Sequence, residues 1–518
     1  MTIWQKQSIP KPCGTVRSGL IALTGVFLAL AGCGGSDSDA IRPDNAVPNV
    51  IVIAIDTVRW DTWWIPERTD STDAFSEWAR EAEVFSRAVS AAPWTVPSVA
   101  TVLTGLYPSQ HGGGLFQTPV ANLDQQVPST LNPAVPTLAE ILDTVGLQTA
   151  AVSAHPWFDA NYGLERGFHQ LSLRNGAEKV TRRGLQWLDE EAAKGEPYFL
   201  YLHYMDAHDP HLDLEASRSA VAAMSEAERN GLIASAPESA CGQPDSVICV
   251  RYLRYAQATL ELRDSIAHLP EELRSRGAPD DTLIVLYSDH GEEFHDHQAR
   301  AEARGRDPRG FYGFGHGNSL YQELLHVPLM IWHPGLEGGE VTTPVSLIDI
   351  VPSVVDWMGI SLPEKIEYPG RSFVSLVEEN RAPGAFGWRE ETRQFPPSHD
   401  RELFASGIAY GPEQMSVVSQ GFKLIWHEAD NAREFYNLAD DPLEQNPGSG
   451  DDVAVADELD AELGDYFEWF DSQDYLPPEL SDDVVERLKG VGYLQGVESR
   501  QEEETETETD RGSEDGEP

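Results

Sequence analysis

Continuous apolar runs of strand length recur along this chain from Asn49 onward. Five of them are NVIVIAI, QTAAVSA, YFLYLHY, TLIVLYS and VPLMIW. Each run is apolar at nearly every position rather than at alternate positions, so both faces of the corresponding strand must be buried. The pattern therefore predicts strands inside a parallel or mixed sheet that helices cover on both sides.

Helical periodicity fills stretches between these runs. One apolar face predicts a helix from 75 to 85, and a second predicts a helix from 252 to 269. The first face comprises Phe75, Trp78, Ala79, Ala82 and Phe85, and the second comprises Tyr252, Tyr255, Thr259, Leu262, Ile266 and Leu269. Because strands and helices alternate, we expect an α/β fold, a three-layer sandwich with a mostly parallel central sheet.

The pattern changes from about residue 405. The segment EQMSVVSQGFKLIWHEADNAREFYNLADDP predicts short strands joined by a turn, and the helix-like DDVVERLKGVGYL follows it. The last segment, QEEETETETDRGSEDGEP, is too poor in apolar side chains to fold. We therefore expect a main domain at 49–404, a small C-terminal α+β subdomain at 405–496 and a disordered acidic tail at 497–518.

The formal net charge of −48 limits the partners of the chain. Nucleic acids and anionic membrane surfaces attract Lys and Arg, so neither is expected to bind this protein. An anionic substrate remains compatible with the acidity, because bound metal ions can make a site locally positive.

The first 32 residues predict an export signal. Lys6, Lys11 and Arg17 precede an apolar run from Leu20 to Ala31. A basic region followed by a short apolar stretch is typical of a signal peptide, and the run is too short for an ordinary membrane-spanning helix. LAGC, at the end of the run, resembles the lipobox of bacterial lipoproteins.

The lipobox resemblance implies that Cys33 carries lipid after removal of residues 1–32 and that a flexible linker, 33–48, follows. The protein would then be exported and held by its lipid on the periplasmic or surface side of a bacterial membrane. A plain signal peptide or an uncleaved anchor is the alternative. Cys241 and Cys249 lie eight apart, which suits a disulfide loop in an oxidising compartment, although two free thiols remain an alternative.

The segment TVPSVATVLTG predicts a helix with Pro97 near its first turn and Gly105 near its end. Thr95 would stand at or just before the N-terminus of this helix, where free amide groups and the helix dipole favour an anion. Taken alone, Thr95 would be an ordinary helix cap.

Ionisable residues at the ends of three apolar runs change this interpretation. In open α/β sheets, ligands bind at the carboxyl ends of the strands. Two carboxylates, an imidazole and the Thr95 hydroxyl would form an oxygen-rich metal site, and a divalent ion there would make the hydroxyl a nucleophile. The ionisable residues are Asp56 after the first run, His203 and Asp206 at the third, and Asp289 and His290 after the fourth.

In their order along the chain, these motifs resemble the sulfatase family of the alkaline phosphatase superfamily. The matching segments run from Asn49 to about Gly496. They are PNVIVIAIDTVRWD, TVPSVATVLTG, YLHYMDAHDPH, SDHGEEF, GHGNSLYQELLHVPLMIWHPG, VSLIDIVPSVVDWMGISLP, EFYNLADDPLEQN and RLKGVGYL. The resemblance implies an alkaline phosphatase-like fold and a hydrolase of sulfuric or phosphoric esters.

The resemblance also implies a metal centre. Asp56, Asp289 and His290 would hold the ion, and Thr95 would be both the nucleophile and a further metal contact. Calcium is the ion that the family implies, while oxygen ligands also suit magnesium and His290 leaves manganese or zinc open.

Two histidines and an arginine complete the implied site. His208 and His316 would bind the charged oxygens of the substrate or protonate the leaving group. His203 and His211 compete with His208 for this assignment. Arg59 would neutralise an anion or support the metal shell, and a salt bridge is an equal alternative.

Three positions depart from the family pattern. Sulfatases convert a signature Cys or Ser into formylglycine, whereas oxidation of Thr95 would give a ketone. Val99 replaces the signature Arg, and Thr57 replaces a second metal-binding Asp. A plain Thr alkoxide resembles the nucleophile of related phosphoryl- and phosphonate-transfer enzymes, and it would form a phospho- or sulfo-threonine that water must cleave.

The sequence therefore predicts a metal-dependent hydrolase of sulfate or phosphate/phosphonate esters with an unmodified Thr nucleophile. Two alternatives stay open. One is a transferase that moves a phospho-headgroup between lipids or glycans. The other is a pseudoenzyme that binds sulfated or phosphorylated glycans without turnover.

Overall fold

The computed structural model describes the main body of the chain, which falls in one compact unit, Arg42–Pro518. The predicted signal peptide, Cys33, the linker, the acidic tail and most of the final helix-like piece lie outside the described residues. Those residues are 49–65, 73–115, 128–159, 161–192, 194–208, 210–276, 282–304, 312–379, 401–448, 453–470, 481 and 486–487.

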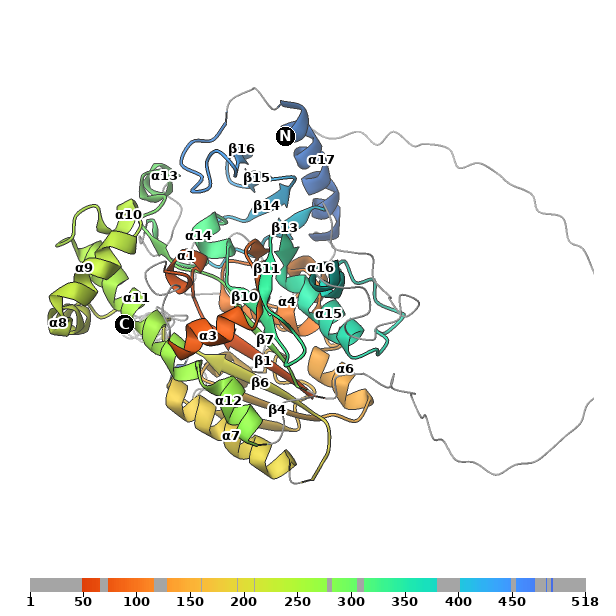
Figure 1. Ribbon diagram of the computed structural model, residues 1–518. Coiled ribbons are helices and arrows are strands. Elements are labelled where there is room, and N and C mark those ends of the chain that lie inside the picture. Colours follow the sequence, from red (N-terminus) through yellow and green to blue (C-terminus); the bar gives the residue numbers. More distant parts are fainter. Residues whose placement is uncertain are drawn as a thin grey trace, which may run out of the picture. The chain divides into compact units, whose positions relative to one another are not determined.

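An eight-stranded sheet forms the centre of the fold (Figure 1). The strands β7, β1, β6, β4 and β5 run parallel, and β10 pairs antiparallel with both β7 and β2. This arrangement confirms the predicted α/β fold with a mostly parallel sheet. The strand order is β11 (Gly339–Val341), β2 (Glu83–Phe85), β10 (Leu329–Trp332), β7 (Thr282–Ser288), β1 (Asn49–Ile55), β6 (Tyr198–Tyr204), β4 (Gln148–Ser153) and β5 (Gln170–Leu173).

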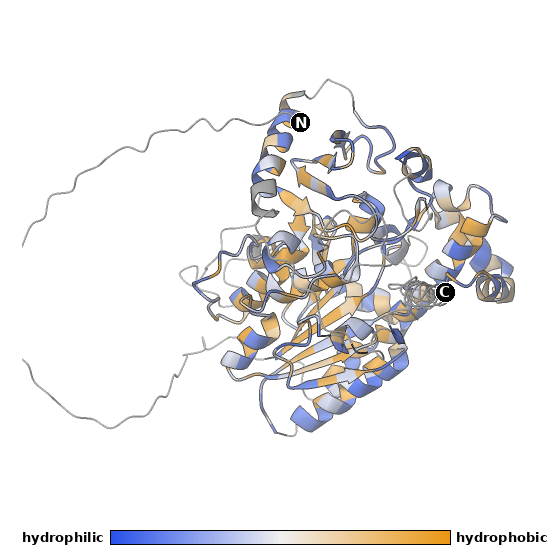
Figure 2. Ribbon diagram, turned by 180° about the vertical axis from the view of Figure 1, so that it is seen from behind, coloured by the Kyte–Doolittle hydropathy of each residue, from blue (hydrophilic) through white to orange (hydrophobic). Residues whose placement is uncertain are grey.

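Helices cover both faces of the sheet. Along β1, Val50, Val52 and Ala54 pack into one hydrophobic core, while Ile51 and the alternate residues after it pack into a second. Both faces of β1 are therefore buried, as its unbroken apolar run requires, and orange is the main colour of the central strands in Figure 2. The first core contains α4 (Thr95–Thr104), α6 (Leu138–Thr144) and α15 (Ile350–Trp357), and the second contains α3 (Ala74–Arg80), α7 (Ala177–Ala192), α11 (Val247–Ile266) and α12 (Leu269–Ser275).

Two predicted helix boundaries are wrong. The helix that starts at Ala74 ends at Arg80, so Phe85 belongs to β2 and packs into the opposite core from Phe75. Leu269 begins a separate helix, α12, because α11 ends at Ile266. In both places the apolar spacing of a strand or of a second helix continued the periodicity of the first helix by coincidence.

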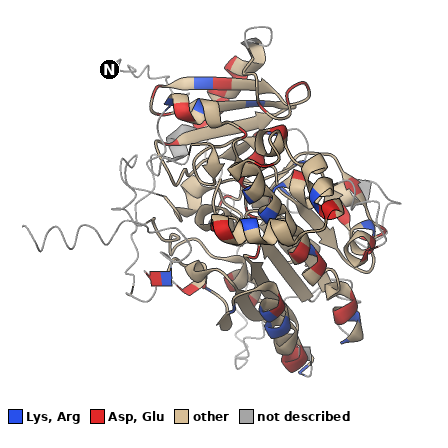
Figure 3. Ribbon diagram, turned by 90° about the vertical axis from the view of Figure 1, so that its left-hand side faces the viewer, with Lys and Arg blue, Asp and Glu red and all other residues tan. Residues whose placement is uncertain are grey.

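Three short helices form an insertion before α11: α8 (Leu214–Ala223), α9 (Glu226–Ser235) and α10 (Glu238–Cys241). A disulfide between Cys241 and Cys249 joins α10 to the first turn of α11. The central strands β1, β4, β6 and β7 contain no Lys, Arg, Asp or Glu, whereas many of the helices carry such residues (Figure 3). None of the described helices is both long enough and apolar enough to cross a membrane.

A second, four-stranded antiparallel sheet forms the small C-terminal part, with α17 (Val453–Phe470) packed against it. Lys423 and Glu444 form a fully buried ion pair of 2.7 Å there, and Glu444 also accepts a hydrogen bond from the Gln322 backbone of the main domain. These contacts attach the small sheet to the main domain. Its strands are β13 (Leu403–Ala405), β14 (Gln414–Ser419), β15 (Phe422–His427) and β16 (Ala432–Asn437).

Short elements complete the described fold. They are α1 (Trp60–Trp63), β3 (Ala88–Val89), α5 (Pro108–His111), η2 (Pro156–Asp159), β8 (Glu293–Phe294), α13 (Gln298–Arg304), β9 (Phe314–Gly315), α14 (Gln322–Leu325), β12 (Val345–Ser346), η3 (Leu347–Asp349) and α16 (Val374–Glu379).

Candidate active site

The carboxyl ends of four parallel strands meet at one edge of the central sheet. Ile55, the last residue of β1, pairs with Tyr204 at the end of β6 and with Ser288 at the end of β7. Ser153, the last residue of β4, pairs with His203 of β6. The residues that follow these strands are therefore brought together, and they are the ionisable ones.

Asp56 and Asp289 form a buried carboxylate pair at this edge, each with 0 % exposure. Oδ1 of Asp289 accepts hydrogen bonds from the backbone N–H groups of Thr57 (3.2 Å) and His290 (2.8 Å). Within the described part of the chain, neither oxygen of Asp56 nor Oδ2 of Asp289 has a hydrogen-bond partner. Three buried carboxylate oxygens with no donor are costly unless a cation binds them.

His290 presents a lone pair to these carboxylates. Its Nδ1–H donates to the Gly291 carbonyl (2.9 Å), so Nε2 carries the lone pair. Nε2 lies 3.5 Å from Asp56 Oδ1, 3.6 Å from Asp289 Oδ2 and 3.3 Å from Thr95 Oγ1. Burial, followed by the charge of His316, lowers the pKa of His290, which keeps the ring neutral.

The four predicted metal ligands therefore converge, and the ligand atoms of Asp56, Asp289 and His290 all lie within 4.8 Å of one another. Burial alone would raise the pKa of Asp56, but nearby imidazoles, His208 first, lower it below its usual range. Burial and the charge of Asp56 raise the pKa of Asp289. Two oxygen donors, one hydroxyl and one neutral imidazole fit a divalent cation, which would stabilise both carboxylates in their charged form.

Thr95 is the first residue of α4, and several contacts hold this helix end in place. The Trp94 indole donates to the Gly407 carbonyl (2.8 Å), and the Ser98 hydroxyl donates to the Asp289 carbonyl (2.7 Å). Gly105 ends the helix with φ +69°, a left-handed conformation that glycine adopts without strain. Val99, at the position of the family arginine, is fully buried in the hydrophobic core.

Thr57 stands where the family has a second aspartate, and its side chain does not face the carboxylate pair. Its hydroxyl donates to the Asp56 carbonyl (2.7 Å), and its backbone has φ 60°. A left-handed conformation is unusual for a β-branched residue, so the turn after β1 is strained. Thr57 thus contributes backbone geometry rather than a metal ligand.

His316 and His208 lie close to His290. The His316 ring is 4.6 Å from the His290 ring and 5.1 Å from the His208 ring, measured between centroids. Nδ1 of His316 lies 3.2 Å from Oε2 of Glu292, a carboxylate that is 1 % exposed. Sequence analysis missed Glu292. The signal for it was the acidic residue that directly follows the SDHG segment.

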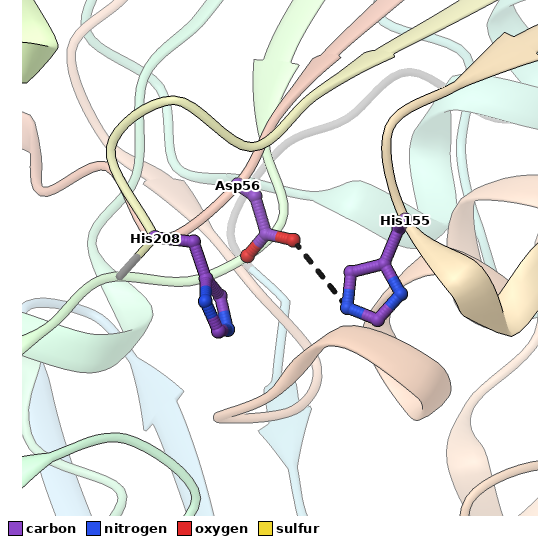
Figure 4. Close-up of side chains that lie close together, drawn as sticks. All are labelled: Asp56, His155 and His208. Carbon is purple, nitrogen blue, oxygen red and sulfur yellow. Dashed lines mark ion pairs between the residues drawn. The ribbon is translucent and has the colours of Figure 1, made fainter. Parts of the chain in front are cut away.

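His155 and His203 also face Asp56, and sequence analysis missed the first of them. Nε2 of His155 lies 3.9 Å from Asp56 Oδ2, and Nε2 of His203 lies 3.4 Å from the same oxygen (Figure 4 shows Asp56 with His155 and His208). Burial lowers the pKa of His155. The signal was a histidine directly after the second apolar run.

His211 lies further from the carboxylate pair. Its ring packs against Tyr255, Phe294 and Phe314, and its Nε2 is 3.9 Å from Glu292. Burial lowers the pKa of His211. The histidine of the YLHYMDAHDPH segment that reaches the His290–His316 pair is therefore His208.

Arg59 departs from the expectation of a substrate-binding arginine. Its guanidinium makes five hydrogen bonds, two to Asp61, two to Asp296 and one to the Glu292 carbonyl. A guanidinium has five N–H donors, so all are used within the protein. The salt-bridge alternative therefore describes Arg59, which pairs with the exposed Asp61 and the largely buried Asp296. It also supports the loop that carries Asp289 and His290.

Comparison with known proteins identifies the family of this chain. The sulfatase family model matches residues 48–360. The uncharacterized sulfatase YidJ of Escherichia coli K12 is 23 % identical over 449 residues, 76 % of this chain and 80 % of that protein.

Two solved structures share the fold. BT4656, solved with its substrate D-glucosamine-2-N,6-O-disulfate, has a TM-score of 0.58 and 17 % identity and covers 83 % of this chain and 99 % of its own. The phosphonate monoester hydrolase SpPMH of Silicibacter pomeroyi has a TM-score of 0.52 and 19 % identity and covers 81 % and 94 %.

Proposed function

We propose that this chain, which belongs to the sulfatase family and is a sulfatase-like ester hydrolase, is metal-dependent and uses unmodified Thr95 as its nucleophile. The observation that carries the proposal is the convergence of Asp56, Asp289, His290 and the Thr95 hydroxyl, where three carboxylate oxygens of the two aspartates have no hydrogen-bond donor among the described residues. A divalent ion held by these residues would lower the pKa of the hydroxyl and stabilise negative charge on the substrate.

Residues of the chain then carry out the attack, the protonation of the leaving group and the hydrolysis of the intermediate. The Thr95 oxygen attacks the sulfur or phosphorus atom, and the bond to the ester oxygen breaks. His316, held at Nδ1 by Glu292, gives a proton from Nε2 to the departing alcohol, and His208 beside it binds the charged oxygens of the substrate. Water activated by the same imidazole cleaves the threonine ester and releases sulfate or phosphate.

The substitutions around Thr95 favour phosphate or phosphonate esters over sulfate. Thr95 has no route to a formylglycine hydrate, so its ester must be cleaved by water rather than released by elimination. Val99 lies in the hydrophobic core and offers no charge to such a hydrate. The fold is compatible with this chemistry, because SpPMH is named as a phosphonate monoester hydrolase. A sulfated substrate remains the alternative, as BT4656 was solved with one.

Matched aryl esters test the proposal. The metal-stripped protein is reloaded with Ca²⁺, Mn²⁺ or Zn²⁺ and assayed on an aryl sulfate, phosphate monoester, phosphodiester and phosphonate. We expect metal-dependent turnover that Thr95→Ala lowers at least about a thousandfold. Thr104→Ala, which removes a buried threonine from the other end of the same helix, should retain it.

Three results would contradict the proposal: no turnover with any ester or metal, Thr95→Ala matching the parent protein, or a mass spectrum showing an oxidised residue 95. Absence of turnover with retained binding of a sulfated or phosphorylated glycan would favour the pseudoenzyme. Product found mainly on an added alcohol rather than as free acid would favour the transferase.

We also propose that the protein is an exported lipoprotein with lipid on Cys33. The basic start, the apolar run and LAGC support this proposal. Metabolic labelling with a fatty acid should mark the parent protein, and Cys33→Ser should lose both the label and sedimentation with membranes. Equal labelling of the variant would contradict it.

A further inference from the structure

The loop that joins β13 to β14, residues 406–413, packs against the main domain although both strands belong to the small sheet (Figure 1). Ala409 and Tyr410 of this loop are 3 % and 7 % exposed and belong to the hydrophobic core that contains α4. The Ser406 backbone N–H donates to the Ala91 carbonyl (3.0 Å). The loop contains no helix or strand, so its shape depends on individual hydrogen bonds of this kind.

The loop contacts the residue that precedes Thr95. The Gly407 carbonyl accepts a hydrogen bond from the Trp94 indole (2.8 Å). Trp94 is fully buried, and Thr95 directly follows it as the first residue of α4. A change in the position of Gly407 would therefore move the start of α4, and the Thr95 hydroxyl with it.

The loop also contacts the residue that follows His316. The Gly317 carbonyl accepts hydrogen bonds from the backbone N–H groups of Ala409 (2.8 Å) and Tyr410 (2.9 Å). Gly317 has φ +77°, and a Cβ atom there would lie 2.9 Å from the Ala409 Cβ, so this close approach requires a glycine. The Gly317 N–H donates to the Pro93 carbonyl (2.9 Å), which joins the segment of His316 to that of Thr95.

Glu413, the last residue of the loop, fixes the shape of the loop. Its Oε1 accepts hydrogen bonds from three backbone N–H groups, which belong to Gly407 (2.9 Å), Ile408 (3.2 Å) and Gln414 (3.1 Å). The Glu413 backbone N–H in turn donates to the Glu428 carboxylate (3.2 Å). Two of the three donors lie near the start of the loop and the third lies just after its end. One oxygen atom therefore ties the two ends of the loop together.

We propose that Glu413 is a positioning residue, which closes the loop 406–413 and thereby sets the place of Thr95 relative to His316. The proposal rests on the proposed function, in which Thr95 attacks the ester and His316 protonates the leaving group. Both residues must reach the same ester group in one step, and a displacement of about 1 Å can lower the rate about 100-fold. The two residues already flank His290: Thr95 Oγ1 lies 3.3 Å from its Nε2, and the His316 ring lies 4.6 Å from its ring.

Two substitutions of similar size test the acceptor oxygen in the full chain. Glu413→Met removes it, whereas Glu413→Gln keeps it. We expect Glu413→Met to lower kcat for an aryl ester about 10- to 100-fold with KM changed less than about twofold, and Glu413→Gln to stay within about threefold of the parent. Inhibition by vanadate, which mimics the five-coordinate transition state, should weaken by the same factor as kcat, and inhibition by inorganic phosphate should not. Asp430→Leu is the matched control and should keep the parental kcat, because Asp430 accepts from the Ala432 backbone (3.1 Å) in the β15–β16 turn of the same sheet.

Trp94→Phe tests the connection from the loop to Thr95, because it removes the indole donor to Gly407 and keeps an aromatic ring. It should also lower kcat, and the double variant Trp94→Phe/Glu413→Met should fall no further than the more affected single variant, since both break one connection. Parental kcat in either single variant, an equal loss in Glu413→Gln and Glu413→Met, or losses that multiply would overturn the proposal. Circular dichroism identifies a folding failure of Glu413→Met, and Trp94→Phe then decides the question.

Hydrogen exchange separates this proposal from the proposed function, because it needs no turnover. The Gly317 amide, which donates to the Pro93 carbonyl, should exchange faster in Glu413→Met than in the parent and in Glu413→Gln. Faster exchange in a protein that hydrolyses no ester would leave Glu413 as the residue that holds the two segments and would remove the hydrolase. Full turnover and unchanged exchange in Glu413→Met would remove the positioning role and leave the hydrolase intact.

Discussion

Replacing Glu292 with glutamine tests whether His316 protonates the leaving group. In the structure, the buried Glu292 carboxylate lies 3.2 and 3.3 Å from His316 Nδ1. Glu292→Gln keeps the size of the side chain, and it keeps the backbone carbonyl that accepts a hydrogen bond from Arg59 (3.1 Å). The amide oxygen can still accept from Nδ1–H, so the substitution removes only the charge of the acceptor.

The expected cost follows from that loss of charge. A hydrogen bond to a charged group stabilises by about 1.5–3 kcal/mol and a neutral one by about 0.5–1.5 kcal/mol, so the difference is about 1–1.5 kcal/mol. At about 1.36 kcal/mol per tenfold change, kcat should fall about 5- to 13-fold. This reduction in kcat should appear in full for esters of weakly acidic phenols, because their oxygen needs a proton to leave. It should be absent for nitrophenyl esters, whose oxygen leaves without one.

The assay is kcat for a series of aryl esters that differ only in the acidity of the phenol. Glu293→Gln is the matched control, because this neighbouring buried carboxylate contacts the His297 backbone and Asn318 instead of His316. Its plot of rate against phenol acidity should have the same slope as that of the parent protein. An equal loss for every phenol in Glu292→Gln, or no loss for any, would refute the assignment of His316 as the acid.

Three further predictions concern the frame of the site. Lys423→Met should lower the free energy of unfolding by about 3–5 kcal/mol, because it leaves the buried Glu444 carboxylate unpaired. The double variant Lys423→Met/Glu444→Gln should recover most of this loss, and denaturant titrations measure both. Burial alone would lower the pKa of His297, but nearby carboxylates, Glu323 first, raise it from 6.5 to about 9. The stability that the charged histidine gives the fold is therefore complete below pH 6.5 and is lost as the pH rises through 9. His297→Gln should flatten that part of the curve of unfolding free energy against pH. Gly291→Ala would bring a methyl group to 1.9 Å from the Glu323 carbonyl oxygen, and displacement of the loop that carries Asp289 and His290 by about 1 Å should lower kcat about 100-fold with unchanged circular dichroism. Full activity in this variant would contradict the packing argument.

The sheet was predictable because burial of both faces leaves a direct record in the sequence. β1, β4, β6 and β7 each correspond to an unbroken apolar run, and parallel pairing then places their carboxyl ends at one edge. The helix that begins at Thr95 was also readable, since Gly105 marks its end through a local backbone requirement. Helix ends at Arg80 and Ile266 were not readable, because the apolar spacing continued past them into the next element.

Part of the candidate site could be read from the same pattern. Asp56, Asp289 and His290 follow their strands directly, so their position at the sheet edge follows from strand order. His155 was missed because its run seemed to end before it, at Ala154. Glu292 was missed because its partner, His316, lies 24 residues further along, on a different loop.

The role of Arg59 could not be decided from the sequence alone. Its sequence neighbours allow either a substrate contact or an ion pair, and the choice depends on Asp296, which lies 237 residues away. The same limit applies to Asp56, whose two oxygens are distinguished only by which imidazoles the fold brings to each side.

The sequence by itself determined which segments are buried, that they form a mostly parallel sheet, and that acidic and histidine residues gather at the carboxyl ends of its strands. Hydrophobic burial scales with apolar area and has no directional requirement, so a linear pattern is enough to specify it. Only the tertiary structure decided which imidazoles face Asp56, that Glu292 holds His316, and that Arg59 is neutralised within the protein. Electrostatic interactions depend on the separation and burial of particular atoms, and those distances exist only once the chain has folded.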